Sequence, residues 1–272
     1  LARLGYSYQW DGGWQAGLAY QFDYKDMNIY NEGKLTLDLT FTHQLVRMGA
    51  AKDWNNIQVS LGIDFDYYHY HDLLSLDPLA SALFENSSLF SYFAGLVFNN
   101  LNERSAPTKG MSWAVSYHLY TDNLFQYKDN NPISVFDARW QGCFSPSSKL
   151  TVTPSFMDAY CPEAIIILCH HQYGGGTIPG AICHSRYRLR AINRAELSQA
   201  ALLVAGLNLR QRILKNQYIS VMGSYGRNSG KFHQILDSSE SVDMAGVGIG
   251  YMYKSFLGPV EIQLNWSNRR RK

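Results

Sequence analysis

A cluster of thiol and imidazole side chains lies in one stretch of the chain: Cys161, Cys169, His170, His171, Cys183 and His184. Such groups are the usual ligands of zinc. The closely spaced Cys pairs of structural zinc sites are missing, however, and an oxidising compartment favours disulfides. Zinc binding, a disulfide among Cys161, Cys169 and Cys183, and free thiols all stay open. We assign no metal and no cofactor.

Hydrolase chemistry lacks its nucleophile motif here. A lipid acyl hydrolase with a Ser–Asp dyad places its Ser in G-x-S-x-G, on a strained strand-to-helix turn, and its Asp in Asp-Gly-Gly or Asp-Gly-Ala. No G-x-S-x-G occurs, and Asp11-Gly12-Gly13 lies between alternating stretches, where it predicts a tight turn. No nucleophile motif accompanies His43 or His118, and Cys143 is expected to pack on a strand. We therefore expect no catalytic residue among these residues.

Strands must position these side chains, because apolar and polar residues alternate along the whole chain. From Ile57 to Tyr67 every odd position is apolar and every even one is small or polar, which places the two kinds on opposite faces of a strand. The pattern recurs at Trp14 to Tyr24, Leu35 to Leu45, Met111 to Tyr120, Ala245 to Tyr253 and Val260 to Trp266, and more weakly at Tyr92 to Phe98, Phe136 to Phe144, Leu150 to Phe156, Leu203 to Leu209 and Gln217 to Tyr225. With Leu1 to Trp10, about twelve strands are predicted.

The chemistry of the two faces favours a membrane barrel over a soluble all-β domain. The polar face carries Ser, Thr, Gly, Gln, Asn and Asp with few lysines, which is typical of a barrel lumen. Aromatic residues end the apolar stretches, as in the girdles at membrane interfaces. The interface candidates are Trp10, Trp14, Tyr20, Tyr24, Tyr67, Trp113, Tyr117, Tyr251, Tyr253 and Trp266. We predict an all-β fold, a transmembrane antiparallel β-barrel of the outer membrane.

This fold assigns a side to individual residues. Leu39 and Ile63 are expected to face lipid, whereas Thr40 and Ser60 face the lumen. His43 and His118 fall on the polar faces of their strands and are expected in the lumen as well.

Connection lengths agree with a barrel, because short and long ones alternate. The short set is Asp11 to Gly13, Arg47 to Asn55, Asn99 to Gly110, Ser145 to Lys149, Ile213 to Asn216 and Lys254 to Pro259, and the long set is Lys25 to Lys34, His69 to Leu89, Thr121 to Pro132, Tyr160 to about Glu196 and Arg227 to Asp243. The short set would face the periplasm, and residues 160–196 would form a long external loop.

Bulk properties exclude other classes. A content of 46% hydrophobic and 14% aromatic residues is incompatible with disorder, and 272 residues suit one domain. No apolar run reaches the ~20 residues of a membrane helix. The net charge of +2 gives no reason to invoke nucleic acid, and Arg269 to Lys272 are expected in a solvated loop.

Both ends of the chain are abrupt. No signal segment precedes the first strand, and the chain stops after a strand and a basic loop. Because closed barrels leave no edge and bacterial ones use an even strand number, we expect at least one strand after Lys272 and others before Leu1. Residues 1–272 are thus predicted to form a single partial barrel domain.

The segment from Phe98 to Ser112 carries a recognisable turn. It resembles the strand-turn-strand signature of the bacterial surface antigen barrels through Asn99, Asn100, Pro107, Thr108 and Gly110. Those barrels are shared by outer-membrane assembly factors, two-partner secretion transporters and patatin-like autotransporters. Residues 195–197, 207–212, 215–218 and 257–261, and Asn265 to Asn268, are similar to the patatin-fused branch. The resemblance covers about residues 92–272 and implies a sixteen-strand barrel in a Gram-negative outer membrane.

The long loop departs from the pattern of the assembly factors and transporters, because it lacks their Arg-Gly-aromatic tip. It carries Arg186, Arg188 and Arg190 instead. These arginines could plug the lumen by pairing with Asp64, Asp66, Asp137 or Glu261, since a charge in a confined interior needs a partner. Alternatively, they bind lipopolysaccharide phosphates or solvent.

Three functions follow from the resemblance. The favoured one is a barrel that anchors or translocates a patatin-like lipid acyl hydrolase lying outside this chain, which would make the full-length protein a phospholipase. The alternatives are a barrel for protein assembly or secretion, and a passive pore or structural barrel. Expected partners are outer-membrane lipids, lipopolysaccharide and a fused or associated periplasmic or passenger domain, with no nucleic acid.

Overall fold

The structure of the protein, a computed structural model, describes residues 2–31, 34–75, 86–103, 106–128, 130–160, 173–175, 186–188, 195–197, 201–237, 241–256 and 258–268. Twelve long strands lie in this described part: β1 (Ala2–Gln9), β2 (Trp14–Asn31), β3 (Lys34–Trp54), β4 (Ile57–Ser75), β5 (Ser87–Asn99), β6 (Gly110–Thr121), β7 (Ile133–Cys143), β8 (Leu150–Tyr160), β12 (Ala201–Leu214), β13 (Gln217–Ser229), β14 (Ser241–Ser255) and β15 (Gly258–Ser267). The short elements are β9 (Tyr173–Gly175), β10 (Arg186–Arg188), β11 (Ala195–Leu197) and the 3-10 helix η1 (Phe232–Gln234). No helix of these ranges has the length and apolarity to cross a membrane. The predicted all-β fold is confirmed.

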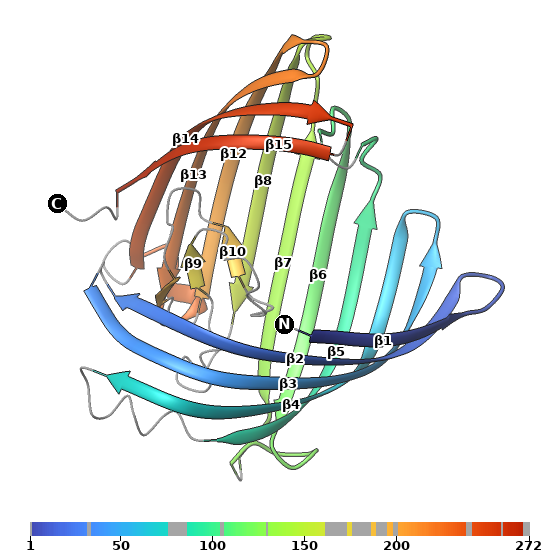
Figure 1. The fold of residues 1–272 in the computed structure, drawn as a ribbon, viewed down its shortest axis with the longest axis vertical. Coiled ribbons are helices and arrows are strands. Elements are labelled where there is room, and N and C mark those ends of the chain that lie inside the picture. The colour runs from blue at the N-terminus through green and yellow to red at the C-terminus, as the bar shows by residue number, and fades with distance from the viewer. Residues whose placement is uncertain are drawn as a thin grey trace.

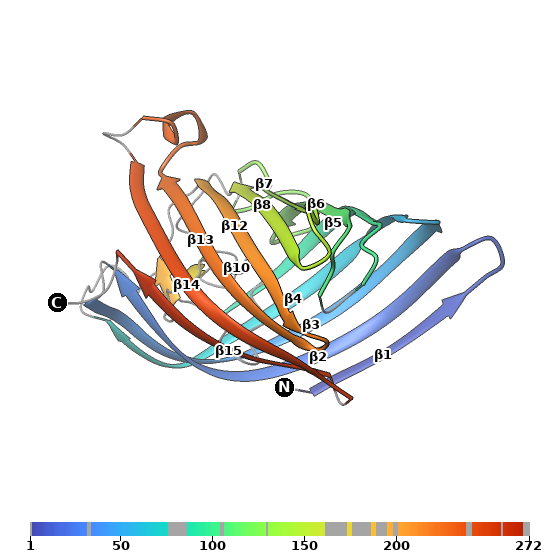
Figure 2. The same cartoon turned by 90° about the horizontal axis from the view of Figure 1, so that it is seen from above.

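The long strands form one antiparallel sheet in chain order, from β1 to β8 and then from β12 to β15. Figures 1 and 2 show that the sheet curls strongly, so that one face is concave and the other convex. Strands with a persistent right-handed twist curl in this way, and closing the curl produces a barrel. The short strands β9 and β10 lie on the concave side, and β11 pairs with Ile29 and Tyr30 of β2.

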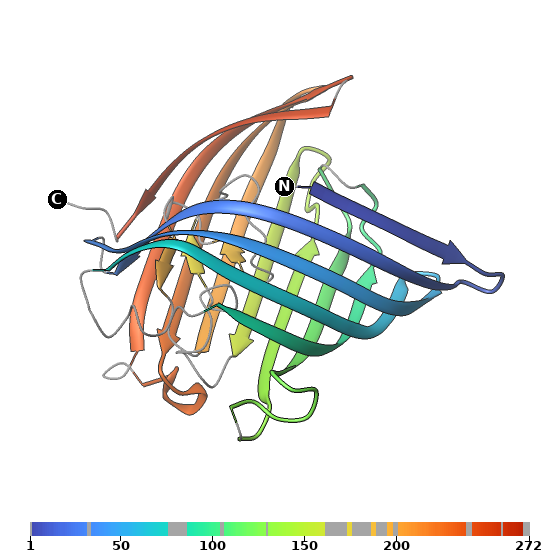
Figure 3. The ribbon, with the colours of Figure 1, turned by 60° about the horizontal axis from the view of Figure 1, so that its bottom comes forward.

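The connections alternate between two ends of the sheet, as Figure 3 lets the reader follow. At one end Gly12 and Gly13 turn β1 into β2 with positive φ angles, which confirms the predicted turn at residues 11–13. Three predicted connections were wrong in extent, because residues 25–31 belong to β2, residues 47–54 to β3 and residues 69–75 to β4. These stretches pair with a neighbouring strand, so backbone hydrogen bonds keep them extended where the apolar alternation fades.

The two faces of the sheet are inverted relative to a water-soluble protein. Apolar side chains on the convex face are exposed, with Leu61 at 60%, Leu264 at 63% and Ile262 at 66% of their maximal areas. Polar and charged side chains are buried on the concave face, where Asp23 and Asp64 are each 1% exposed. A polar interior inside an apolar exterior is the arrangement of a transmembrane β-barrel. We call the concave face the inner wall.

The predicted orientation is right for β4 and wrong for part of β3. Ile63 lies on the convex face and Ser60 on the inner wall, whereas Leu39 is 1% exposed on the inner side of β3 and Thr40 points outward. On the outside Thr40 donates a hydrogen bond to Asp26 (2.8 Å). Polar groups of this kind are stable facing water, so this end of β3 has a polar exterior and packs its apolar residues inward.

Gly62 on β4 has no side chain, and the ring of Phe93 lies in the space beside its Cα atom. A Cβ atom on Gly62 would lie 2.3 Å from the Met48 carbonyl oxygen and 2.6 Å from Cζ of Phe93. The ring of Phe93 therefore occupies the space that a side chain at residue 62 would need. Covering a strand glycine with an aromatic ring fixes the strand register.

Gly62→Ala is expected to lower the free energy of unfolding by about 2 kcal/mol, because an overpacked site has to move its backbone. Gly223→Ala is the matched control, since a Cβ atom there would meet nothing within 4 Å. Urea titration followed by tryptophan fluorescence in detergent measures both. Equal stability of the two variants would contradict the packing of Phe93 over Gly62.

Candidate functional site

The inner wall is the candidate site, because its polar side chains line the space that any passing molecule would contact. Arg47 on β3 holds Asp64 on β4 in a bidentate ion pair: its Nε donates to Oδ1 at 2.7 Å and its Nη2 to Oδ2 at 2.5 Å. The pair forms because the strand register places Arg47 directly opposite Asp64. The guanidinium also lies 4.7 Å from the ring centroid of Phe93. Fork-to-fork geometry of this kind is strong and directional.

A second polar cluster lies further along the same two strands, where His43 contacts Asp66 diagonally across the strand register. Nε2 of His43 is 2.7 Å from Oδ1 of Asp66, and its Nδ1 is 3.9 Å from Oδ2 of Asp23 on β2. The imidazole stacks on Tyr68 with ring centroids 4.4 Å apart and planes 7° from parallel. Three strands are thus cross-linked by buried side chains, which stiffens this part of the wall.

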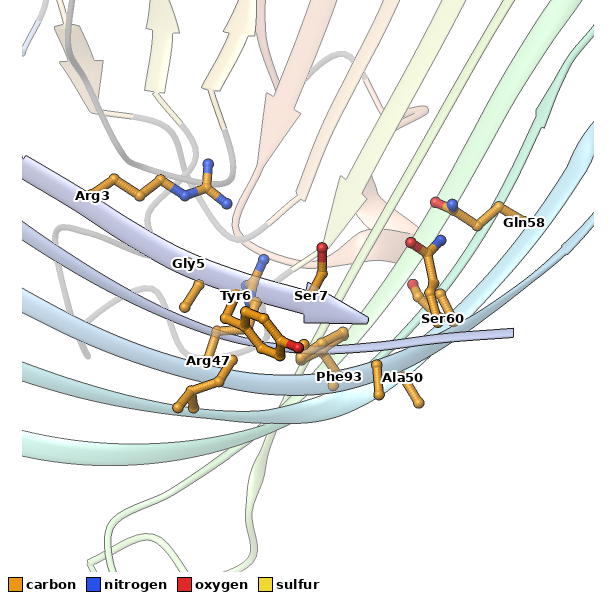
Figure 4. A pocket seen from close by; sticks show the side chains of 16 residues that line it. Arg3, Gly5, Tyr6, Ser7, Arg47, Ala50, Gln58, Ser60 and Phe93 are labelled. Atoms are coloured by element: carbon orange, nitrogen blue, oxygen red, sulfur yellow. The ribbon is translucent and has the colours of Figure 1, made fainter. Parts of the chain in front are cut away.

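A hollow of about 580 Å³ lies on the inner wall over β1 to β4. Figure 4 shows the side chains around it, among them Arg3, Ser7, Gln58 and Ser60. The polar groups of its lining are hydroxyls, amides and the cations of Arg3 and Arg47. A space of this polarity holds water in a barrel lumen.

The part of the inner wall formed by β7, β8, β12 and β13 has a different character. Within the described residues, Asn208 Oδ1, Arg210 Nε and Ser224 Oγ are buried and have no protein partner. All three residues line a smaller hollow of about 250 Å³ together with Pro107. Buried polar groups need partners, so water molecules are expected in this hollow.

Asparagine side chains hold the described residues of the turn that joins β5 to β6, residues 100–103 and 106–109. Asn102 Oδ1 accepts hydrogen bonds from the backbone N–H groups of Thr108 (3.0 Å) and Lys109 (3.1 Å), and its Nδ2 donates to Thr108 Oγ1 at 2.9 Å. Asn100 Oδ1 accepts from the N–H of Met111 at 2.6 Å. Asn side chains often replace backbone groups in tight turns in this way. Asn99 likewise accepts from the N–H of Leu101 at 3.1 Å.

Gly110 ends this turn in a conformation that favours glycine. Its φ is +105°, and a Cβ atom would lie 2.4 Å from the Asn100 carbonyl oxygen. Gly110→Ala is therefore expected to cost roughly 2 kcal/mol of folding stability. It should also admit protease cleavage in residues 100–109. Gly230→Ala, where a Cβ atom meets nothing within 4 Å, is the control, and an uncut, fully stable G110A protein would refute the argument.

The structure places the predicted lumenal carboxylates beside partners from the wall itself. Asp64 pairs with Arg47 and Asp66 with His43, while Asp137 lies 3.6 Å from Arg139, and Glu261 accepts a hydrogen bond from Gln263. The loop arginines predicted to pair with them, Arg186, Arg188 and Arg190, have side chains outside the described residues. Their role as a plug stays a prediction.

Sequence reasoning missed Arg47, and it placed His43 in the lumen without a partner. Their partners Asp64 and Asp66 lie on the next strand. The two contacts could therefore be predicted only from the strand register, and not from a local motif. Arg47 itself was assigned to a short connection.

The predicted interface aromatics point mostly outward. At least a third of the side-chain surface is exposed at Trp10, Trp14, Tyr20, Tyr24, Tyr117, Tyr251, Tyr253 and Trp266. Tyr67 and Trp113 are partly exposed, on strand positions that also face outward. Their place at the membrane interface stays a prediction.

The sulfur and imidazole candidates are only partly described. Cys143 is a buried free thiol on β7, with its Sγ 3.6 Å from Thr153 Oγ1. His118 lies on the inner wall beside Phe93, at 6.0 Å between ring centroids. Cys161, Cys169, Cys183 and their neighbouring histidines lie outside the described residues. Within the described ranges no three His, Cys, Asp or Glu side chains are grouped to hold a metal ion.

Comparison with known proteins gives one family and a set of similar folds. The family model described as the OMP85 superfamily matches residues 19–272. BamA from Haemophilus ducreyi, lacking POTRA domains 1-3, superposes with a TM-score of 0.76 at 13% identity, over 99% of this chain and 58% of that chain. CdiB from Escherichia coli superposes with a TM-score of 0.57 at 12% identity, over 97% of this chain and 48% of that chain. Comparison with curated proteins returned no match.

At these identities the two structures show the shared fold alone. The chain spans between about half and three fifths of their lengths. The predicted barrel is thereby confirmed as the fold.

Proposed function

Since the chain belongs to the OMP85 superfamily, we propose that it is the membrane-embedded barrel of a protein that inserts or secretes other polypeptides. Its setting is the outer membrane of a Gram-negative bacterium. The observation that carries the proposal is the superposition of the whole sheet on the BamA barrel, at a TM-score of 0.76.

The inner wall suits passage or assembly of an extended chain. The Arg47 guanidinium is already paired with Asp64, so neither of these two charges is available to trap a charged substrate. The other inward groups include hydroxyls and amides that exchange hydrogen bonds with water or with a peptide backbone. The apolar convex face holds the barrel in lipid.

The patatin-linked function, favoured from sequence, has weaker support. It rests on short resemblances near the end of the chain, whereas the structural neighbours are BamA and CdiB. We place no catalytic step on these residues, and a lipase activity would need a domain outside them. The partners predicted from sequence, namely outer-membrane lipids, lipopolysaccharide and a periplasmic or passenger domain, are likewise proposals.

The test uses the full-length protein reconstituted in liposomes. A urea-denatured outer-membrane barrel is added, and its insertion is followed by protease protection and by heat-modifiable migration in gels. Insertion several-fold faster than in empty liposomes, or in liposomes with an unrelated barrel, supports the proposal. Equal rates count against it, and release of fatty acids from the phospholipid would favour the patatin-linked function instead.

A further inference from the structure

Arg210 on β12 carries a buried positive charge. The residue is 9% exposed, and it forms no ion pair with a carboxylate in the described part of the chain. Glu103 and Glu261 act on its charge from beyond ion-pair distance, and Glu103 is paired with Lys254 on β14. A buried guanidinium is costly unless an adjacent negative group compensates its charge. An anion from solution would supply that compensation.

Contacts on two sides hold the Arg210 guanidinium in place. Its Nη2 donates a hydrogen bond to the Pro107 carbonyl oxygen, and the ring centroid of Tyr218 on β13 lies 5.7 Å from the guanidinium carbon. Its Nε is buried and has no partner among the described residues. Because an arginine carries five N–H donors in a planar group, this fixed guanidinium keeps a donor for a ligand.

The smaller hollow, of about 250 Å³, is lined by Arg210 on the inner wall, where β7, β8, β12 and β13 run side by side (Figure 1). Among the described residues its lining includes this one cation and no carboxylate. The other polar side chains of the lining are hydroxyls and amides, namely those of Gln141, Thr153, Ser155, Asn208 and Ser224. Hydroxyls and amides can donate hydrogen bonds to an anion. The charge and the donors of the hollow therefore favour an anion over a cation.

The strand register sets Asn208 beside Arg210. The two residues lie two positions apart on β12, so they share the inner face with their Cα atoms about 7 Å apart. Asn208 Oδ1 is buried without a partner among the described residues, and half a turn of the amide presents Nδ2 to an anion instead. Gly206 is the next residue on this face, and a Cβ atom there would lie 2.6 Å from Ser155 Oγ. The missing side chain at residue 206 thus leaves space for the Ser155 hydroxyl.

We propose that the smaller hollow binds a small oxyanion, either phosphate or the carboxylate of a small solute, through the Arg210 Nε–H and the Asn208 amide. The hydroxyls of Ser155 and Ser224 hold the water molecules that complete its shell. Water alone satisfies the hydrogen bonds of the hollow, but only an anion also compensates the charge of Arg210. The site requires an aqueous lumen, and it is independent of the proposed insertion or secretion activity.

Equilibrium dialysis of the full-length protein in detergent against radiolabelled inorganic phosphate tests the site. The wild type should bind phosphate with a dissociation constant on the order of 1 mM, the affinity of a few charge-assisted hydrogen bonds in a hydrated site. Unlabelled phosphate and acetate, compared at equal ionic strength, distinguish the two sources of the oxyanion, because the preferred ligand displaces the label at the lower concentration. Chloride should be about tenfold less effective than either, since it lacks their paired oxygen acceptors. Equal displacement by chloride would overturn the oxyanion assignment.

Two variants localise the binding. Arg210→Gln should weaken it about tenfold, the effect of losing one charge-assisted hydrogen bond. That change also removes the hydrogen bond to Pro107, so a displaced turn could account for it. Asn208→Asp avoids the ambiguity, because it keeps Arg210 and places a carboxylate of nearly the same shape beside it. This carboxylate should pair with Arg210, repel phosphate and weaken its binding about tenfold as well.

Arg3→Gln is the matched control, because it removes a cation from the larger hollow over β1 to β4. Its phosphate binding should equal that of the wild type, and heat-modifiable migration verifies that each variant is folded. The inference is overturned if the wild type binds no phosphate at millimolar concentrations or if Asn208→Asp binds it like the wild type. It is also overturned if Arg3→Gln loses as much binding as Arg210→Gln.

Discussion

Arg47→Gln is expected to lower the free energy of unfolding by about 3 kcal/mol, because it leaves a buried carboxylate without its cation. The Asp64 side chain is 2% exposed and takes both of its described hydrogen bonds from Arg47. A glutamine offers one neutral donor in place of two charged ones. Asp64→Asn should cost only about 1 kcal/mol, since the remaining cation is partly solvated. The Arg47 side chain is 32% exposed and keeps its contact with the Phe93 ring.

Urea titration in lipid vesicles, followed by tryptophan fluorescence, separates the two variants. The double variant, Arg47→Gln with Asp64→Asn, should be more stable than Arg47→Gln alone, because no buried charge is left unpaired. Losses that simply add would mean that the two residues do not depend on each other. Equal losses in the single variants would contradict the unequal burial of the pair.

Much of the fold could be predicted because a period of two is a local property. The strand around Ile63 was predicted with its two faces correctly assigned, and Asp64 was placed in the lumen. The alternation around Leu39 is equally regular, yet its apolar face turns inward. Alternation shows that a strand has two unlike faces. Which face meets lipid depends on the residues and solvent that surround that part of the strand.

The candidate site was less predictable, because its contacts join distant residues. The asparagines of the β5–β6 turn could be found from a local motif, and so could Gly110. Nothing near Glu103 indicates Lys254, which lies 151 positions along the chain. Arg210 and Pro107, 103 positions apart, meet only because β6, β7 and β8 carry the curvature of the sheet between β5 and β12. The curl of the sheet, rather than any short pattern, brings these residues together.

The second large prediction concerns which face of the sheet meets lipid. It compares Ile63 and Ser60, which lie three residues apart on β4 and on opposite faces. Ile63 is exposed on the outer side, between its register partners Met48 on β3 and Tyr92 on β5. Ser60 lines the inner hollow, where Figure 4 shows it. Ile63→Arg is expected to cost about 3 kcal/mol, the penalty of a cation on the lipid face of a barrel. Ser60→Arg should cost well under that, because its guanidinium can extend into a hydrated lumen.

The comparison is informative only in lipid. Unfolding in vesicles should separate the two variants by at least about 2 kcal/mol, whereas a short-chain detergent, which deforms around a charge, should narrow the gap. Ser60→Arg as the more damaging change would place lipid on the concave face and would invert the barrel. Because Arg47, Asp64 and Ser60 share the concave face, the Arg47–Asp64 ion pair would then lose its aqueous surroundings too. This one pair of substitutions therefore tests which face of the sheet meets lipid.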